Sequence, residues 1–491
     1  MAILAEMGNR VPLQKFVSGT RRGAVVAVAA LALSATSRAA DWSSFRGPNA
    51  TGIARTDSLP VEFGPGKNVV WKTALPAGKS SPVLTENRIF LTGHNDTGLL
   101  TICLDRATGE ILWSRTLPQE RDQRLHRLND RASPTPATDG ANVYVFFGDF
   151  GLVSYGPEGN QRWVYPLGPF LNQHGMTASP ILVDNKVILV CDQDKGSFVL
   201  ALDKDTGEVV WRTERPEAAY GFATPAVFHP QGGEAQLVIP GSYVGIGYSL
   251  RTGEKLWWVR GLTWQAKPAA VVDGGIVVFT GWSPGADPGE QVFCPSFEEA
   301  LEETDADKDG FISQQELPAK WKPTGSWSEL DRDRNGFADA FEWMFYRLMR
   351  SSRNVTLAVK PANARGDLTE SHVIWSADRY VPEVPTPLAY QGLLYTVKDG
   401  GILSVTNLES GENLKVSRMR GAIDKYYSSP VVGDGKIYLI SETGKLSVLK
   451  PGADWETLAV NDMGEPGYAT PAIEDGRIYL RTSSSLYCFA N

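Results

Sequence analysis

TGEVVW, from Thr206 to Trp211, is one of four similar stretches that each end in tryptophan. TGEILW ends at Trp113, GNQRW at Trp163 and TGEKLW at Trp257, so the successive tryptophans are 50, 48 and 46 residues apart. The glycine supplies the positive φ that a tight hairpin turn requires. A tight turn followed by a strand that ends in a large aromatic residue, repeated at this spacing, is typical of the blades of a β-propeller.

A second marker, a Ser/Thr-Pro pair before an apolar run, recurs along the chain and is degenerate once. It occurs as SSPV at Ser80, ASPT at Ala132, ASPI at Ala178, ATPA at Ala223, Lys267-Pro268 (degenerate), PTPL at Pro385, SSPV at Ser428 and ATPA at Ala469. Because four short strands fit between markers, the sequence predicts an all-β fold, an eight-bladed β-propeller of four-stranded blades. The last repeat has only three strands. We expect residues 68–76 to supply its fourth strand and to close the ring, since closure removes exposed sheet edges.

The Thr-Gly…Trp ends and the Ser/Thr-Pro starts cover nearly all of residues 41–491. In both features the chain resembles the pyrroloquinoline-quinone-like β-propeller repeat proteins. The stretch WSSFRGPNATG (Trp42–Gly52) resembles the branch that includes propellers similar to the outer-membrane protein assembly factor. The resemblance implies the fold, and for function it implies a binding or scaffold protein or, as the alternative, a quinone-dependent dehydrogenase.

The first 39 residues have the features of a secretory signal. Arg21-Arg22 precedes an apolar run from Gly23 to Leu33, and small residues precede Ala40. We therefore expect an exported protein, periplasmic or extracellular, with no transmembrane helix after signal removal. The other predicted divisions are an N-terminal extension (40–67), the first part of the propeller (68–283), an inserted EF-hand pair (284–353) and the rest of the propeller (354–491).

The chain is acidic, with a formal net charge of −8 that becomes −12 when the five basic residues and one acidic residue of the signal are removed. This charge argues against nucleic acid or an anionic membrane as partner. The four cysteines are far apart in sequence, at Cys103, Cys191, Cys294 and Cys488. We expect Cys103, Cys191 and Cys488 to be buried free thiols, because they lie in apolar strand-like runs. A Cys103–Cys488 disulfide is the alternative, but equivalent strands of neighbouring blades hold these residues too far apart for it.

Two acidic stretches, DADKDGFISQQE and DRDRNGFADAFE, match the calcium loop of an EF-hand. Calcium binds about six to eight oxygens, and the loop supplies them at fixed positions around a glycine turn, with a closing glutamate. The predicted ligands of two calcium ions are Asp305, Asp307, Asp309, Phe311 (carbonyl), Ser313 and Glu316, and Asp331, Asp333, Asn335, Phe337 (carbonyl), Asp339 and Glu342. Position 8 is Ile312 in the first loop but Ala338 in the second, which leaves the pairing of the two loops open.

The insertion falls between the second and third strands of blade five. Successive antiparallel strands alternate ends, so this connection leaves on the face that carries the Ser/Thr-Pro loops. We therefore expect the calcium-binding module to form a cap at the mouth of the channel. The same face should carry a cationic and aromatic funnel that holds a protein or small-molecule ligand, formed by Lys79, Arg131, His174, Gln265, Lys267, Tyr426, Tyr427 and Tyr468.

No catalytic residues are predicted. The chain has no adjacent pair of cysteines, no CxxCH motif, no GxSxG and no HExxH. We therefore do not expect pyrroloquinoline quinone as a cofactor, and a calcium-binding, ligand-binding or scaffold propeller is favoured over the dehydrogenase. Ordinary solvated loop residues remain the alternative interpretation of the funnel.

Overall fold

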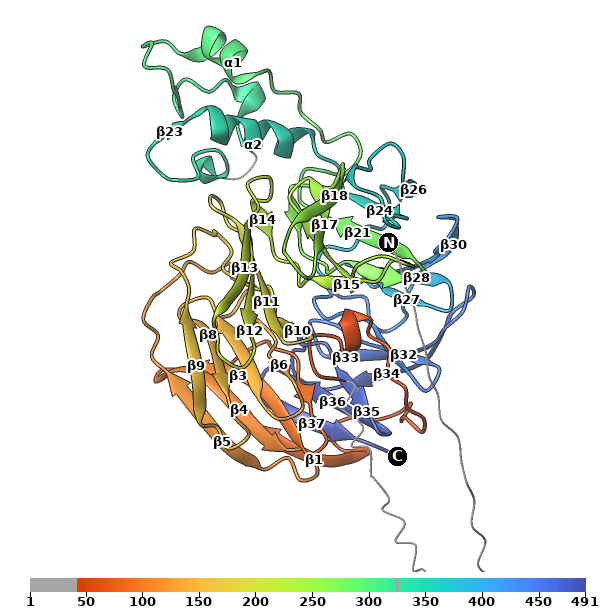
Figure 1. Cartoon of the computed structure of the whole chain (residues 1–491). Coiled ribbons are helices and arrows are strands. Elements are labelled where there is room, and N and C mark those ends of the chain that lie inside the picture. Colours follow the sequence, from red (N-terminus) through yellow and green to blue (C-terminus); the bar gives the residue numbers. More distant parts are fainter. Residues whose placement is uncertain (1–41, 324–325) are drawn as a thin grey trace, which may run out of the picture. The chain divides into compact units, whose positions relative to one another are not determined.

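The computed structural model describes residues 42–323 and 326–491, so the predicted signal at residues 1–39 lies outside the described residues. The strands form eight sheets that contain four consecutive antiparallel strands each (Figure 1). The prediction of an eight-bladed β-propeller of four-stranded blades is confirmed.

The strands of the first four blades follow one another in sequence. Blade one contains β2 (Val83–Leu84), β3 (Arg88–Asn95), β4 (Gly98–Asp105) and β5 (Ile111–Leu117), and blade two contains β6 (Ala137–Thr138), β7 (Val143–Phe147), β8 (Gly151–Tyr155) and β9 (Gln161–Pro166). Blade three contains β10 (Ile181–Val183), β11 (Lys186–Cys191), β12 (Phe198–Asp203) and β13 (Val209–Glu214). Blade four contains β15 (Ala226–Phe228), β16 (Gln236–Gly241), β17 (Val244–Ser249) and β18 (Lys255–Arg260), to which β25 (Gly366–Asp367) adds in parallel.

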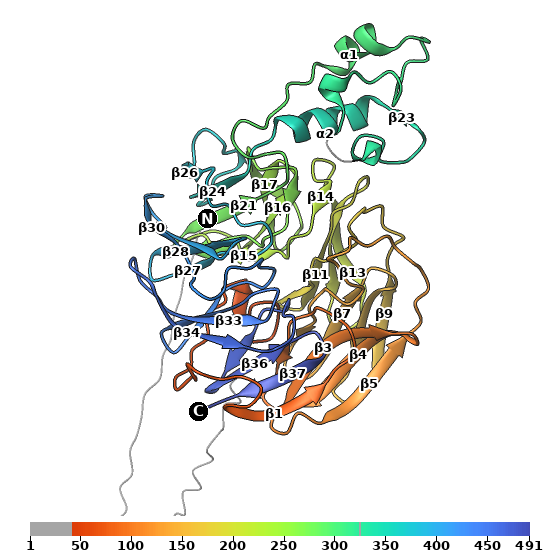
Figure 2. The ribbon, with the colours of Figure 1, turned by 180° about the vertical axis from the view of Figure 1, so that it is seen from behind.

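The remaining blades are seen best from the opposite side (Figure 2). Blade five contains β20 (Val271–Asp273), β21 (Ile276–Gly281), β24 (Val355–Val359) and β26 (Val373–Ala377), and blade six contains β27 (Leu388–Tyr390), β28 (Leu393–Lys398), β29 (Ile402–Asn407) and β30 (Asn413–Arg418). Blade seven contains β31 (Val431–Gly433), β32 (Lys436–Ile440), β33 (Lys445–Lys450) and β34 (Glu456–Asp462). Blade eight contains β35 (Ala472–Glu474), β36 (Arg477–Arg481), β37 (Ser485–Phe489) and, as its outer strand, β1 (Val69–Ala74).

The ring is closed by the N-terminal strand, as predicted. β1 pairs antiparallel with β37, with Trp71 opposite Cys488 and Ala74 opposite Ser485. The first strand of the propeller therefore completes the last blade. Cys103, Cys191 and Cys488 are buried free thiols, as expected, and Cys294 is a fourth. Cys103 and Cys488 lie in third strands of neighbouring blades, as predicted.

Burial explains the sequence pattern of the blades. Middle strands such as β11 are almost continuous apolar runs because both of their faces pack on neighbouring blades. The outer strand β13 buries mainly Trp211, whose indole N–H donates to Leu250 O in the next blade at 3.3 Å. Trp113 makes the same contact with Pro157 O at 2.8 Å. The Thr-Gly turn fits this contact, since a Cβ on Gly109 would lie 2.4 Å from the Trp71 ring and its φ is +75°.

Residues 42–54, which we name the N-terminal plug, contact the innermost strands of several blades. Trp42 O accepts from Leu84 N at 2.8 Å, Ser43 O accepts from Thr138 N at 2.9 Å, and Gly52 O accepts from Val432 N at 2.7 Å. The side chain of Asn49 bonds both the N–H and the carbonyl of Val227, at 2.6 and 2.7 Å. The plug, which includes the 3-10 helix η1 (Pro48–Ala50), thus joins blades one, two, four and seven across the ring.

The insertion of blade five lies between β21 and β24. It contains α1 (Phe297–Thr304), β22 (Ile312–Ser313), the 3-10 helices η2 (Ala319–Trp321) and η3 (Trp327–Glu329), β23 (Phe337–Ala338) and α2 (Ala340–Ser351). It has an apolar core of its own that includes Ile312, Trp321, Leu330, Trp343 and Tyr346. Both helices begin with a capping box, at Ser296 and Asp339. We refer to residues 285–353 as the inserted module.

Among the described residues, no helix is both long enough and apolar enough to cross a membrane.

Candidate functional site

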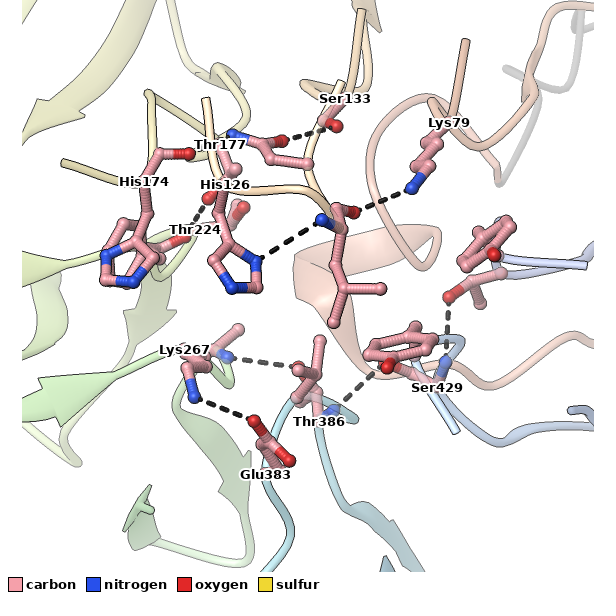
Figure 3. Close-up of a pocket in the computed structure, with 18 of the residues that line it drawn as sticks. Lys79, His126, Ser133, His174, Thr177, Thr224, Lys267, Glu383, Thr386 and Ser429 are labelled. Carbon is pink, nitrogen blue, oxygen red and sulfur yellow. Dashed lines mark hydrogen bonds and ion pairs between the residues drawn. The ribbon is translucent and has the colours of Figure 1, made fainter. Parts of the chain in front are cut away.

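A cavity of about 510 Å³ opens among the loops that precede the first strands of the blades (Figure 3). All eight blades contribute to its wall, so the cavity lies where the Ser/Thr-Pro loops converge. Phe45 of the N-terminal plug also lines it. The plug therefore supplies part of the cavity wall, a contribution that no motif of the sequence indicates.

The deeper wall is a ring of eight residues. Seven of them directly precede the proline of a Ser/Thr-Pro pair, and Ala269 takes the corresponding place in blade five. A backbone N–H of one blade donates to the hydroxyl of the next, at 2.9 to 3.1 Å in all seven such bonds. The ring positions, in blade order, are Ser81, Thr135, Ser179, Thr224, Ala269, Thr386, Ser429 and Thr470. This regular hydrogen bonding explains why the marker contains serine or threonine before proline.

The outer wall consists of the residues two positions before each ring residue, and all eight line the cavity. In blade order they are Lys79, Ser133, Thr177, Phe222, Lys267, Val384, Tyr427 and Tyr468. Of the predicted funnel, Lys79, His174, Gln265, Lys267, Tyr427 and Tyr468 therefore lie together around the cavity.

Two predicted funnel residues lie elsewhere. Blade two has two Ser/Thr-Pro pairs, and the ring uses Thr135-Pro136 rather than Ser133-Pro134, so Ser133 takes the place predicted for Arg131. Arg131 instead pairs with Asp122 and Asp149. Tyr426 is buried in the core, where its hydroxyl donates to Ala422 O at 2.7 Å.

The cavity is cationic although the protein is acidic. Lys79, Arg127, Lys267 and Lys425 line it, and Glu383 is the one acidic side chain among the described lining residues. Lys267 Nζ lies 3.2 Å from Glu383 Oε1, and Lys79 Nζ lies 4.0 Å from the centre of the Tyr468 ring. Burial lowers the pKa of both lysines, while nearby carboxylates oppose the shift. A bound anion would relieve this cost of burying positive charge.

A pair of histidines forms one side of the cavity. The ring centres of His126 and His174 are 5.1 Å apart, and His174 also contacts Phe222. Burial, together with the positive charge of neighbouring groups, lowers the pKa of His174 to about 4. The ring is therefore neutral at pH 7, and its buried Nδ1 atom has no hydrogen-bond partner in the described structure.

A buried cation lies beside the cavity, within the plug. Arg46 is 1% exposed, and its guanidinium donates to the carbonyls of Ala50, Pro387 and Pro430 at 2.9 to 3.2 Å. No carboxylate among the described residues pairs with it, and burial lowers its pKa to about 9. Phe45, the residue before it, lines the cavity, so this positive charge adds to the cationic character of the site.

The two acidic loops of the inserted module have matching geometry. Asp305 accepts from Gly310 N and Asp331 accepts from Gly336 N, each at 3.1 Å. Glu316 accepts from Ala306 N and Ser313 N at 3.0 and 2.9 Å, and Glu342 makes the equivalent bonds to Arg332 N and Asp339 N at 2.7 and 3.1 Å. β22 pairs with β23 with Ile312 opposite Ala338, so the alanine at position 8 does not prevent the pairing of the loops.

The donor groups of both loops fit a calcium ion. Oxygens of Asp305, Asp307 and Asp309 lie within 4.8 Å of one another, as do those of Asp331, Asp333 and Glu342. One buried oxygen of Asp305 and one of Asp331, at position 1 of each loop, have no hydrogen-bond partner in the described structure. Hydrogen bonds from Ser313 lower the pKa of Glu316, whereas burial raises that of Glu342. The carboxylates of Glu316 and Glu342 are oxygen ligands of the kind that calcium binds.

The inserted module contacts the rim of blades three and four. Arg332, at position 2 of the second loop, pairs with Asp194 in the connection between β11 and β12. Gln173 donates to Ser328 O at 2.6 Å, and Tyr243 donates to Phe345 O at 3.0 Å. The cavity wall itself includes Trp282 and Pro284, the first residue of the predicted insertion, but, among the described residues, none from 285–353. The module therefore contacts the rim of the mouth, and the cap over the mouth stays a prediction.

The donor set of the cavity does not fit the calcium and quinone pair of the dehydrogenases with this fold. A calcium ion beside the cofactor needs several oxygen ligands. Glu383 is the single carboxylate among the described lining residues, and Lys267 already pairs with it. The clusters of acidic groups found in the described structure are those of the two loops in the inserted module.

Comparison with known proteins gives the class of the fold. The model of the family described as outer membrane protein assembly factor BamB matches residues 64–187, which include strands β1 to β10. None of the curated proteins compared matches the sequence. The protein is a pyrroloquinoline-quinone-like β-propeller.

Solved structures share this fold at low sequence identity. A europium-containing methanol dehydrogenase matches with a TM-score of 0.58 and 10% identity over 92% of this chain and 98% of its own. BamB from Moraxella catarrhalis matches with a TM-score of 0.52 and 10% identity over 86% and 98%. The quinohemoprotein alcohol dehydrogenase ADHIIG from Pseudomonas putida HK5 matches with a TM-score of 0.52 and 13% identity over 92% and 80%. At this low identity, the similarities show the fold alone.

Proposed function

We propose that this protein is an exported calcium-binding propeller that binds an anionic ligand in the cavity at its channel face. The observation that carries the proposal is the charge of the cavity. Four cationic side chains line it, and the one carboxylate among the described lining residues is paired with a lysine, although the protein has a formal net charge of −8. Concave sites with convergent charges of one sign attract and hold ligands of the opposite sign.

The shape of the wall favours a ligand with a planar ring. The rings of Tyr427 and Tyr468 lie 5.6 Å apart on one side of the cavity, with Lys79 against Tyr468. Trp282 lies on another side, with Lys267 Nζ 5.1 Å from its ring centre. A cavity of about 510 Å³ is large enough for a small organic molecule. The ligand class that fits is a small aromatic or heterocyclic acid.

Two calcium ions are proposed for the inserted module. The loops have the same hydrogen-bond pattern, and the position 1 aspartate of each holds a buried oxygen with no partner in the described structure. A cation at each loop would satisfy that oxygen. An exported protein meets calcium at high concentration, so sites with a Kd of roughly 10⁻⁶ to 10⁻⁴ M would be occupied.

The proposal is tested by calorimetry on the calcium-loaded protein. Isophthalate, a planar dicarboxylate, is titrated as the probe, and isophthalamide, its neutral analogue of the same shape, serves as the control. We expect one isophthalate per chain with an affinity that weakens as salt rises, and at least about tenfold weaker binding of isophthalamide. Equal binding of the two probes, or no binding of isophthalate, would count against an anion site.

The alternative, a quinone-dependent dehydrogenase, is supported by the fold shared with the methanol and alcohol dehydrogenases. The carboxylate content of the cavity weighs against it. The two functions are separated by incubating the protein with pyrroloquinoline quinone and calcium and then measuring dye reduction by alcohols. Stoichiometric quinone retention together with dye reduction would establish the dehydrogenase.

A further inference from the structure

The ring of hydrogen bonds around the cavity is interrupted at one seam. Seven ring positions have a hydroxyl, and blade five has Ala269 instead. At the other seams each ring N–H donates to the hydroxyl of the next blade. Thr224, the ring residue of blade four, faces Ala269, and its N–H has no hydrogen-bond acceptor among the described residues. One backbone donor in the deep wall of the cavity is therefore free.

Other polar groups lie beside this donor. β14 (Tyr220–Gly221) pairs in parallel with β19 (Gln265–Ala266), and Phe222 N donates to Ala266 O at 2.8 Å, so the loops that carry Thr224 and Lys267 run side by side. Thr224, Lys267 and His174 all line the cavity (Figure 3). The buried Nδ1 of His174 also has no partner in the described structure. The ammonium of Lys267 pairs with Glu383 at 3.2 Å, and Lys267 is on the loop that runs beside the free N–H. An N–H and an ammonium that line the same cavity can together bind an oxyanion.

We propose that the seam between blades four and five is an oxyanion subsite, in which the Thr224 N–H and the Lys267 ammonium hold a carboxylate or phosphate group of the ligand. This inference rests on the proposed function and makes it more specific. Ala269 is then the determinant of the subsite, because a serine or threonine at this position would accept the Thr224 N–H, as at the other seams. The absence of a hydroxyl in blade five keeps one donor available for the ligand.

The test is the substitution Ala269→Ser, which adds the missing acceptor. Ser81, Ser179 and Ser429 already occupy the same ring position in other blades, so the fold accommodates the side chain. Ala141→Ser is the matched control, since it makes the same change at an exposed position outside the cavity wall. Isophthalate and phenyl phosphate are titrated separately into wild type and both variants, which distinguishes a carboxylate subsite from a phosphate subsite.

We expect Ala269→Ser to weaken binding of the preferred probe by about tenfold or more, and Ala141→Ser to leave it within about twofold. In wild type labelled with ¹⁵N-threonine, the probe should shift the Thr224 amide resonance, and the shift should disappear in Ala269→Ser. If wild type binds isophthalate but Ala269→Ser binds it equally well, the subsite is wrong and the cavity proposal stands. If wild type binds neither probe, both proposals fail.

Discussion

Arg332 Nη2 lies 3.2 Å from Asp194 Oδ1, and this ion pair joins the second acidic loop of the inserted module to blade three. Both side chains are less than 10% exposed, at 7% and 8%. The guanidinium of Arg332 also lies 4.3 Å from the centre of the Tyr220 ring, and Tyr220 contacts His174, which lines the cavity. A continuous set of contacts thus runs from a proposed calcium loop to the wall of the cavity.

Arg332→Gln should release the inserted module from the rim. Removing one partner of a buried ion pair leaves the other charge unpaired, which typically costs about 3–5 kcal/mol. Because Asp194 is buried, we expect faster hydrogen exchange in residues 285–353 and in the β11–β12 connection, with the other blades unchanged. Lys308→Gln, which changes an exposed residue at position 4 of the first loop, is the control. Unchanged exchange in Arg332→Gln would show that the pair does not hold the module.

The double variant Glu316→Gln/Glu342→Gln should abolish calcium binding while the blades stay folded. Each glutamate closes its loop, and a neutral amide cannot supply the two carboxylate oxygens that calcium takes from this position. Calorimetry should find two calcium ions per wild-type chain and none in the variant. At a calcium concentration of 100 times Kd, each ion should stabilise its loop by about 2.7 kcal/mol.

A charge-matched control for this experiment is Glu298→Gln/Glu302→Gln, which changes two glutamates of α1 outside the loops. It should bind two calcium ions like wild type. Calcium binding that persists in Glu316→Gln/Glu342→Gln at the same stoichiometry would contradict the assignment of the ligands.

Removal of β1 should open the ring. A chain that begins at Ala77 lacks the strand that pairs with β37, so the edge of blade eight is exposed and invites aggregation. We expect loss of a cooperative melting transition and concentration-dependent light scattering. A chain that begins at Arg55 lacks the plug but keeps β1, and it should remain monomeric. If the chain from Ala77 melts like the chain from Arg55, closure by β1 is not required.

Stability should decrease in acid because of His174. Its pKa is about 4 in the folded protein and about 6.5 in an unfolded chain. Between these values the unfolded chain binds more protons, so this group's contribution to stability is complete above pH 6.5 and is lost as the pH falls toward 4. The slope is at most about 1.4 kcal/mol per pH unit.

The variant His174→Gln should therefore lose less stability than wild type between pH 6.5 and pH 4 in urea unfolding. His229→Gln replaces an exposed histidine and is the control. Parallel pH profiles for wild type and His174→Gln would contradict a buried neutral imidazole at this position.

The repeats made the fold predictable from the sequence. Each Thr-Gly…Trp end and each Ser/Thr-Pro start serves a local contact that recurs in most blades, such as the Trp113 bond to Pro157 and the Ser81 bond to Thr135. The place of the insertion followed from strand order alone. Six of the eight predicted funnel residues line the cavity. Lys79, Tyr427 and Tyr468 do so because each stands three positions before a marker proline, which fixes its place on the wall.

The remaining features depend on contacts distant in sequence. Blade two offers both Pro134 and Pro136, and only the hydrogen bonds to neighbouring blades identify Thr135 as the ring residue. The predicted wall residue of this blade, Arg131, therefore lies two positions before the actual one, Ser133. The course of the plug depends on bonds such as those of Asn49 to Val227, which no local pattern reveals. The break at Ala269 becomes meaningful only when the other ring positions are known.

The lysines of the cavity provide the most direct measurement of whether it is an anion site. Isophthalate is titrated into wild type, Lys79→Gln/Lys267→Gln and Lys195→Gln/Lys450→Gln, the last of which changes two exposed lysines outside the cavity wall. We predict that the cavity variant binds at least about tenfold more weakly than wild type, since two charge-assisted contacts are lost, and that the surface variant binds like wild type. Equal affinity in the cavity variant and the surface variant would contradict the account.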